Sequence, residues 1–349
     1  MQEVYVFMRA LVYNGIKLTL EQNYPQPVPA EGEALIRMLQ VGICNTDLEI
    51  THGYMDFKGV LGHEFVGVIE DIHGDQAREQ NHHLQGKRVV GEINAACHRP
   101  NCVYCQQGML THCPNRTTLG IVNRDGAFAD YTLLPIENLH IVPDSVSDEE
   151  VVFVEPLAAN FEIFEQVHLK PTDSVIILGD GKMGQLAAQV LALSGCEVIM
   201  VGKHRDKLAL VESRGITTYL LKDVEQVGVV SGRRVDVVVE CTGSANGLAL
   251  AMRMVRPRGT IILKSTVADQ STLSLAPIVI DEIRIQGSRC GPFAPALRAL
   301  QRNMVDVRPL ISATYTLDDG VKAFEYAAER GVLKVLMKIE MEQISRYHL

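Results

Sequence analysis

Three side chains that could bind a metal lie in one short stretch punctuated by glycines, residues 41–70. Cys44 offers a thiol, His63 an imidazole and Glu64 a carboxylate. These are donors that bind Zn2+, and three protein ligands with one open position make a catalytic zinc site. Taken alone, Cys44 and His63 are better interpreted as a small core residue and a hydrogen-bonded core imidazole, since buried free cysteine is common. The interpretation therefore depends on the other motifs in the chain.

A second possible metal site is a cluster of four of the eight cysteines: Cys97, Cys102, Cys105 and Cys113. In a long chain such clustering is typical of metal ligation rather than of a disulfide framework. Four thiolates on a tight loop match a closed tetrahedral zinc site, which stabilises a lobe and takes no part in chemistry. The alternatives are four cysteines without a metal, or a ligand set that includes the neighbouring His98 or His112.

A glycine-rich turn predicts a nucleotide site in the second half of the chain. The apolar run 174–178 leads into Gly179-x-Gly181-x-x-Gly184, followed by a helical stretch at 185–193 and a second strand at 197–201. In this context the motif is a dinucleotide fingerprint. The first glycine permits the turn, the second lets the backbone approach the pyrophosphate, and the third packs helix on strand. Amides at the helix start, at Lys182 and Met183, are expected to face the phosphates.

The residues at the end of the second strand indicate which nucleotide binds. An NAD enzyme places Asp or Glu there to bond the ribose hydroxyls, but this position falls on Gly202 and is followed by Lys203, His204 and Arg205. A missing carboxylate removes repulsion, and cations can hold a 2′-phosphate. We therefore predict NADP(H) over NAD(H). The alternative is that Lys203 and Arg205 are solvated surface charges.

Length and composition indicate the class of protein that contains these sites. At 349 residues, with 47% apolar and 21% charged residues, the chain predicts a soluble protein of about two domains. Short apolar runs at 33–43, 64–72, 87–95 and 127–135 predict a strand-rich first part. The net charge of −9 without a basic run argues against nucleic acid. No signal peptide or membrane span is expected, which predicts a cytoplasmic protein, or an organellar one after removal of a targeting segment.

Several motifs in order carry a family resemblance. GICNTDLE (residues 42–49), GHEFVGVI (62–69), the cysteine loop and the glycine turn resemble the zinc-dependent medium-chain dehydrogenase/reductase family, on its alcohol, polyol and threonine dehydrogenase side. Relatives usually have two residues between the first two loop cysteines, and this chain has four. The resemblance implies an α/β protein with a GroES-like β-rich catalytic domain at 1–153 and 290–349. A doubly wound parallel-sheet (Rossmann) domain is expected at 154–289.

The resemblance also implies roles at the first site. Cys44 and His63 would be ligands of the catalytic zinc, and Glu64 a ligand or a carboxylate beside the metal that exchanges with water. Asp47 would hold the distal nitrogen of His63 and fix its tautomer. Thr46 would pass the alcohol proton outward. The proton then goes either to Glu49, which stands where relatives often have His, or through the ribose and water.

In the second half, Glu155 precedes a helix and is either a solvated charge near the positive helix end or, as in polyol-type relatives, a zinc ligand, directly or through water. Further cofactor contacts implied by the resemblance lie in runs after later strands: Thr242, Gly243, Leu263, Lys264, Ser265, Gly287, Ser288 and Arg289. Arg289 is the candidate for a phosphate contact. The stretch 284–293 resembles the edge strand through which relatives dimerise, so a homodimer or homotetramer is expected.

These features predict a zinc-dependent alcohol dehydrogenase that transfers a hydride reversibly between an alcohol or polyol, or its carbonyl form, and NAD(P). Two zinc ions per chain are expected. The alternatives are a zinc-independent quinone or enoyl reductase on the same fold, a non-catalytic NADP(H)-binding protein, and a structural zinc protein. Zinc content separates these possibilities, and so does stabilisation by nucleotide. The substrate itself and the physiological direction do not follow from the sequence.

Overall fold

The computed structural model describes residues 6–227, 234–266 and 273–340. Its contacts divide the chain into two units, Met1–Glu155 with Leu310–Leu349, and Pro156–Pro309. The second boundary therefore lies later than the predicted residue 290. The segment around Asp306 stays in the second unit because it exchanges two hydrogen bonds with Gln189. Gln189 Nε2 donates to the Asp306 carbonyl at 3.0 Å, and the Asp306 amide donates to Gln189 Oε1 at 2.7 Å.

The first unit is built on a seven-stranded sheet. Its order is β10 (Leu139–Ile141), β6 (Arg88–Gly91), β5 (Glu64–Ile72), β3 (Glu33–Ile43), β18 (Lys334–Lys338) and β17 (Ile311–Thr316), with β9 (Tyr131–Pro135) also pairing with β3. A three-stranded sheet runs β2 (Leu18–Pro25), β1 (Phe7–Tyr13), β4 (Gly59–Val60), and a small one pairs β7 (Asn94–Ala95) with β8 (Thr117–Thr118). The strand-rich prediction for this part is confirmed.

Short helices connect these strands. They are α1 (Asn45–Thr51), α2 (Asp75–Asn81), α3 (Val103–Gln106), α4 (Asp148–Val151) and α12 (Gly320–Ala327), with 3-10 turns at Tyr54–Asp56, His82–Leu84, Leu110–His112, Ile136–Asn138 and Arg308–Leu310. Phe128 is among the largest fully buried side chains of this unit's core and meets Phe324 edge to face at 5.6 Å between ring centroids. Such ring contacts add to the stability that burial gives this unit.

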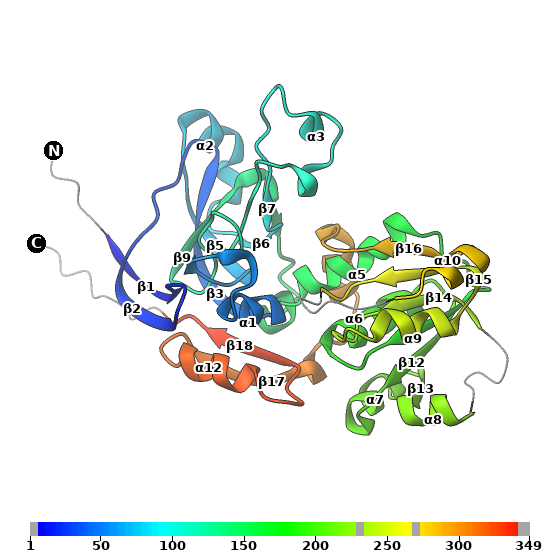
Figure 1. The fold of residues 1–349 in the computed structure, drawn as a ribbon. Helices are drawn as coiled ribbons and strands as arrows, with labels where there is room; N and C mark the ends of the chain where they lie inside the picture. Colours follow the sequence, from blue (N-terminus) through cyan, green and yellow to red (C-terminus); the bar gives the residue numbers. More distant parts are fainter. Residues whose placement is uncertain (1–5, 228–233, 267–272, 341–349) are drawn as a thin grey trace, which may run out of the picture. The chain divides into compact units, whose positions relative to one another are not determined.

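The second unit contains a six-stranded parallel sheet. The order is β13 (Thr217–Leu220), β12 (Glu197–Gly202), β11 (Ser174–Leu178), β14 (Val235–Glu240), β15 (Val255–Leu263) and β16 (Arg284–Gly287). Its helices are α5 (Val154–Gln166), α6 (Lys182–Ala192), α7 (Arg205–Glu212), α8 (Leu221–Val227), α9 (Gly247–Met254), α10 (Ala276–Ile280) and α11 (Phe293–Gln301). The sequence of strands and helices along the chain can be followed in Figure 1. Buried β-branched strands covered by helices are typical of parallel sheets, so the predicted Rossmann architecture is confirmed.

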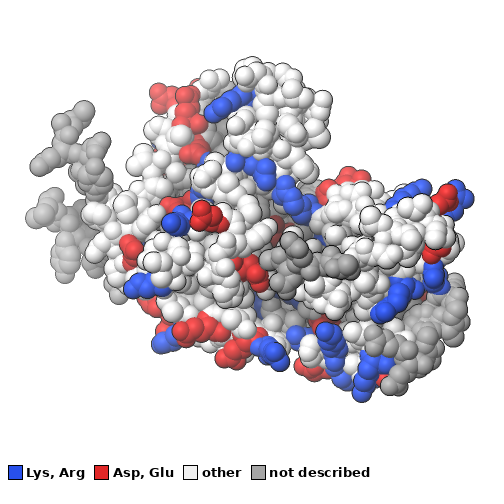
Figure 2. All heavy atoms as spheres, viewed as in Figure 1, with Lys and Arg blue, Asp and Glu red and all other residues white. Residues whose placement is uncertain are grey.

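On the face shown in Figure 2, lysine and arginine side chains are interspersed with acidic ones. Among the residues that the structure describes, no helix is both long and apolar enough to cross a bilayer.

Candidate metal centres and dinucleotide site

The first candidate metal centre lies at one end of the strands β5, β3 and β18. Glu64 is the first residue of β5 and pairs with Gly42 of β3. Cys44 directly follows β3 and is the residue before α1. His63 stands immediately before β5. Sheet register therefore brings together residues that are up to 20 positions apart in the chain, as the two motifs predicted.

These three side chains form a set that could hold one ion. One ligand atom from each of Cys44, His63 and Glu64 lies within 4.8 Å of the others, and no ion is present. His63 and Glu64 are buried, whereas Cys44 is partly exposed. Glu64 Oε1 is buried and has no hydrogen-bond partner among the described residues. A buried carboxylate oxygen without a partner is costly, and a thiol, an imidazole and a carboxylate are zinc donors, so the set fits zinc.

Asp47 organises this set from α1 and is completely buried. Its Oδ2 accepts a hydrogen bond from the Cys44 amide at 2.8 Å, and its Oδ1 accepts one from the Gly62 amide at 3.3 Å. Oδ1 also lies 3.2 Å from Nδ1 of His63. Burial lowers the pKa of His63, but Asp47 and Cys44 outweigh it and raise the pKa well above the ordinary value. Asp47 thus contacts both motifs and leaves Nε2 of His63 for a metal.

Two residues predicted for proton transfer also lie on α1. Thr46 Oγ1 is 3.8 Å from Cys44 Sγ, which places the hydroxyl beside a candidate ligand. Glu49 lies further along the same helix. Glu155, in the first turn of α5, is not in the set of mutually close ligand atoms formed by Cys44, His63 and Glu64. The predicted direct ligation by Glu155 therefore has no support from this set.

Sequence reasoning missed Lys334, the first residue of β18. Its ammonium group forms an ion pair with Oε2 of Glu64, and both side chains are fully buried. Nζ also lies 5.6 Å from the centroid of the Phe153 ring. Burial lowers the pKa of Lys334, but the Glu64 carboxylate outweighs it and raises the pKa above its ordinary value. The available signal was Lys334 as the one charged residue of the run 332–337, where a buried charge needs a partner.

Gly42 makes the contact between Glu64 and Lys334 possible. β3 lies between β5 and β18, so a side chain at residue 42 would stand between the two charged groups. A Cβ there would lie 2.9 Å from Glu64 Oε2 and 3.4 Å from Lys334 Cδ. The lack of a side chain at Gly42 therefore lets the carboxylate and the ammonium group meet across the middle strand.

The four loop cysteines form the second candidate centre. The Sγ atoms are 3.5 Å apart for Cys97 and Cys113, 3.8 Å for Cys102 and Cys113, and 3.9 Å for Cys97 and Cys105. Tetrahedral zinc with Zn–S bonds of about 2.3 Å requires sulfur–sulfur distances of about 3.8 Å. The loop is thus folded to the dimensions of a zinc–tetrathiolate site.

Backbone amides contribute to the cysteine site. Burial raises the pKa of the Cys113 thiol, but hydrogen bonds from the backbone at Cys97 and Asn115 and from the thiols of Cys97 and Cys105 outweigh it and bring the pKa to about 6. Burial and the neighbouring thiols raise the pKa of Cys105 to about 12, so Cys113 is the cysteine of this pair that gives up its proton first. Thiolate is the form that binds metal. His98 is turned to Glu137, with 2.6 Å between Nε2 and Oε1, so the four sulfurs rather than this imidazole form the set.

The glycine turn connects β11 to α6 in the second unit. Gly179 has φ +123°, and a Cβ on it would lie 2.7 Å from the Cys241 carbonyl oxygen. A Cβ on Gly184 would lie 2.0 Å from the Gly179 carbonyl oxygen, so helix and strand approach as closely as the motif predicts. Gly181 precedes α6, and a Cβ there would meet nothing within 4 Å. The backbone at the start of α6 is open, which fits a bound pyrophosphate.

The other residues predicted to contact the cofactor gather at the same edge of the sheet. Parallel pairing aligns the ends of β11, β14, β15 and β16, with Leu178 opposite Glu240, Glu240 opposite Leu263, and Leu263 opposite Gly287. Gly243 and Ser265 are joined by a hydrogen bond of 2.9 Å from the Gly243 amide to Ser265 Oγ. The predicted set that follows these strand ends is Thr242, Gly243, Leu263, Lys264, Ser265, Gly287, Ser288 and Arg289. Strand carboxyl ends are where such sheets bind ligands.

Individual members of that set differ in what they contact. Lys264 Nζ donates to the Ala159 carbonyl at 2.6 Å and lies 3.2 Å from Ser288 Oγ. Arg289 Nη1 donates to Cys290 Sγ at 3.3 Å. Lys264 is thus tied to α5 within its own unit, which gives it a structural role beside any contact with nucleotide.

A different carboxylate occupies the strand end at Gly202. Asp180, within the glycine turn, accepts hydrogen bonds from the Lys203 amide at 2.6 Å and the His204 amide at 2.7 Å through Oδ2. Arg205, predicted to attract a 2′-phosphate, instead pairs with Glu212 at 2.9 Å. Sequence reasoning missed Asp180, because its proximity to the strand end at Gly202 depends on the parallel pairing of β11 and β12.

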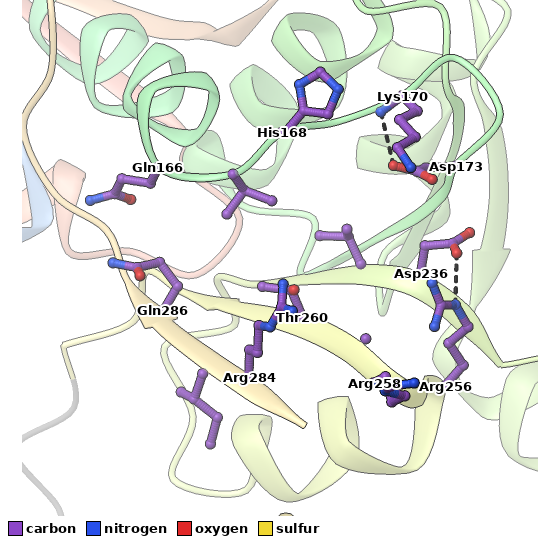
Figure 3. A pocket seen from close by; sticks show the side chains of 14 residues that line it. Gln166, His168, Lys170, Asp173, Asp236, Arg256, Arg258, Thr260, Arg284 and Gln286 are labelled. Carbon is purple, nitrogen blue, oxygen red and sulfur yellow. Dashed lines mark hydrogen bonds and ion pairs between the residues drawn. The ribbon is translucent and has the colours of Figure 1, made fainter. Parts of the chain in front are cut away.

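A cavity of about 390 Å³ lies at the opposite edge of this sheet, where β11, β14 and β16 begin. Figure 3 shows Arg256 directed to Asp236, at 2.7 Å, and the Lys170 amide bonded to Asp173. Its lining contains none of the residues predicted to contact the cofactor. The cavity is therefore separate from the glycine turn.

Comparison with known proteins agrees with this arrangement. Residues 30–144 match the family model of the alcohol dehydrogenase GroES-like domain, and residues 183–304 match that of zinc-binding dehydrogenases. The chain is 28% identical to a sorbitol dehydrogenase of Halalkalibacterium halodurans, with 95% of this chain and 99% of the relative covered. It is also 28% identical to a D-arabitol-phosphate dehydrogenase of Enterococcus avium, with 91% and 93% covered.

Solved structures of dehydrogenases are also similar to this chain. A zinc-binding dehydrogenase of Sinorhizobium meliloti 1021 bound to NADP is 27% identical and superposes with a TM-score of 0.84, covering 95% of this chain and 99% of that one. The alcohol dehydrogenase TADH of Thermus sp. ATN1 is 25% identical, with a TM-score of 0.85 and coverage of 95% and 100%. With the two candidate zinc sets and the glycine turn on its parallel sheet, the chain belongs to the zinc-dependent medium-chain dehydrogenase/reductase family.

Proposed function

We propose that this protein is a zinc- and nicotinamide-dependent dehydrogenase that interconverts a hydroxyl group of a polyol, or of a polyol phosphate, with the corresponding carbonyl. The observation that carries the proposal is the convergence of Cys44, His63 and Glu64 on a chain with a complete dinucleotide turn. The relatives named for sorbitol, D-arabitol phosphate and erythritol support this substrate class.

When bound, zinc supplies a Lewis acid that favours loss of the alcohol proton, and the nicotinamide accepts or returns a hydride. The chain's own residues orient and protect this chemistry. Asp47 fixes the ring of His63 through Nδ1, so that one tautomer presents Nε2 to the metal. Thr46, beside Cys44, receives the alcohol proton and passes it outward. Glu49 is the next acceptor, with ribose and water as the alternative route.

Lys334 acts as a positioning residue for Glu64. Because the lysine engages Oε2, Oε1 stays free of protein hydrogen bonds among the described residues and is the oxygen that can approach the ion. We propose two zinc ions per chain, one held by Cys44, His63 and Glu64 and one by the four loop cysteines. The first unit is then the catalytic domain and the second the dinucleotide domain.

We propose assembly of identical chains, as a homodimer or homotetramer, through the edge strand β16. This strand ends the sheet, and the neighbouring α10 exposes apolar side chains, including Val279 at 75% and Ile280 at 78%. An unpaired edge beside exposed apolar groups is a template for pairing with another chain. Light scattering of the wild type and of Ile280→Asp tests this, and equal masses for the two proteins would contradict it. The cytoplasmic location stays a prediction.

The NADP(H) preference predicted from the sequence assumed a strand end without a carboxylate. Asp180 supplies a carboxylate there, so the choice between the two nucleotides depends on this side chain. The dehydrogenase proposal itself requires only that one of them binds and accepts a hydride.

Two measurements test the proposed function. Elemental analysis should find two zinc ions per wild-type chain and one in a Cys44→Ser, His63→Ala double variant, while the wild type oxidises members of a polyol panel with NAD+ or NADP+. The matched control is His98→Ala, an imidazole outside both sets, which should keep two ions and full turnover. A wild type with a single zinc ion, or a Cys44→Ser, His63→Ala variant with undiminished turnover, would overturn the proposal.

A further inference from the structure

At the end of β12, the side chain of Asp180 fills the space that the absence of a side chain at Gly202 leaves open. Gly202 is the last residue of β12, and Asp180 lies between the first two glycines of the turn after β11. A Cβ placed on Gly202 would lie 2.5 Å from Cβ and 2.6 Å from Oδ2 of Asp180. The carboxylate of Asp180 therefore fills the space into which a side chain at residue 202 would project.

The Asp180 carboxylate is held firmly in this space. Oδ2 accepts hydrogen bonds from the amides of Lys203 and His204, at 2.6 and 2.7 Å. Nδ1 of His204 lies 3.0 Å from Oδ2 and 3.2 Å from Oδ1. Only 10% of the Asp180 side chain is exposed. Oδ2 is thus engaged by two backbone amides, whereas Oδ1 contacts the His204 imidazole and retains capacity to accept.

We propose that Asp180 is the residue that recognises the adenosine ribose and that it selects NAD(H) against NADP(H). In a Rossmann domain the carboxylate at the end of the second strand accepts the 2′-hydroxyl. Here the same place is filled from the glycine turn. This inference rests on the proposed use of a nicotinamide dinucleotide, and it reverses the preference that Gly202 alone predicts.

The reversal follows from charge and from hydrogen-bond donors. A bound 2′-phosphate would place its negative charge beside the nearly buried carboxylate of Asp180. Like charges repel strongly where water is excluded. The amides of Lys203 and His204, which could bind a phosphate at the start of α7, already donate to Asp180. Arg205 is engaged by Glu212 at 2.9 Å. A ribose hydroxyl, in contrast, can donate to Oδ1 without displacing any of these contacts.

Binding measurements separate this role from a purely structural one. Isothermal titration calorimetry with NAD+ and NADP+, and with 5′-AMP and 2′,5′-ADP as fragments that differ only by the 2′-phosphate, gives four dissociation constants without any turnover. We expect the wild type to bind NAD+ and 5′-AMP at least tenfold more tightly than their 2′-phosphorylated counterparts. Asp180→Asn keeps the shape of the side chain but removes its charge, and should shrink both ratios by tenfold or more.

The matched control is Asp206→Asn, an exposed carboxylate in the first turn of α7. It removes the same charge from the same helix end but not from the space above Gly202, so the ratios should change less than twofold. If Asp180 only capped the backbone, Asp180→Asn would weaken all four ligands equally and leave the ratios unchanged, which contradicts the inference. Tighter binding of NADP+ by the wild type would also contradict it.

Failure of this inference can be told apart from failure of the proposed function. A wild type that binds neither nucleotide overturns the dehydrogenase proposal and the inference with it. A wild type that binds both equally, or prefers NADP+, overturns only the role of Asp180. Circular dichroism of Asp180→Asn establishes that the variant is folded, and Asp180→Ser provides a second neutral side chain that can still accept from the two amides.

Discussion

Replacing Lys334 by Met tests whether the buried ion pair is needed to keep Glu64 in place. Both side chains of the pair are fully buried, so the variant leaves a carboxylate without its counter-ion. Breaking a buried pair by removing one partner costs about 3–5 kcal/mol. With a urea m-value of about 3 kcal/mol per molar, the unfolding midpoint should fall by roughly 1–1.7 M.

The assay can be confined to the unit that contains the pair. The chain has no tryptophan, and of its ten tyrosines only Tyr219 lies outside the first unit. Tyrosine fluorescence in a urea titration therefore reports mainly the unfolding of that unit. The titrations are run on metal-free protein, so that a variant at a proposed zinc ligand can be compared with the others.

Two further variants show whether the loss comes from the unpaired charge. Lys334→Met combined with Glu64→Gln removes both charges while conserving shape, and should regain most of the lost stability. Lys322→Met, which breaks an exposed ion pair with Asp319, should leave the midpoint unchanged within error. The reasoning is refuted if Lys334→Met behaves like Lys322→Met, or if the double variant is as unstable as the single one.

Three other predictions follow from the described geometry. Phe128→Ala should destabilise the first unit by about 3–5 kcal/mol in the same titration, because it empties a fully buried ring site; a loss below about 1 kcal/mol would contradict the packing. Cys113→Ser should leave one zinc per chain instead of two by elemental analysis, and retention of both ions would show that the four thiols do not form a metal site. Gly184→Ala should weaken nucleotide binding by calorimetry at least tenfold with zinc content unchanged, since its Cβ would lie 2.0 Å from the Gly179 carbonyl oxygen.

The sequence predicted those parts of the molecule in which the chemistry is local. Gly179, Gly181 and Gly184 are spaced by the turn itself, and strand, turn and helix form there as expected. Cys97 to Cys113 lie on one loop, so their convergence needs little of the rest of the fold. Motifs of this kind can be predicted from the sequence because the local backbone conformation determines where residues close in the chain lie relative to one another.

The tertiary structure alone decided how the charges are paired. Glu64 and Lys334 are 270 residues apart, and only the register of β5, β3 and β18 brings them together across Gly42. Asp180 and Gly202 meet because β11 and β12 are parallel neighbours that end at the same level. Read along the chain, Gly202 marks a strand end without an acid, whereas in space a carboxylate from the adjacent turn fills it. Residue types and local spacing thus determined which groups are available, while strand register, which depends on burial across the whole sheet, determined which of them meet.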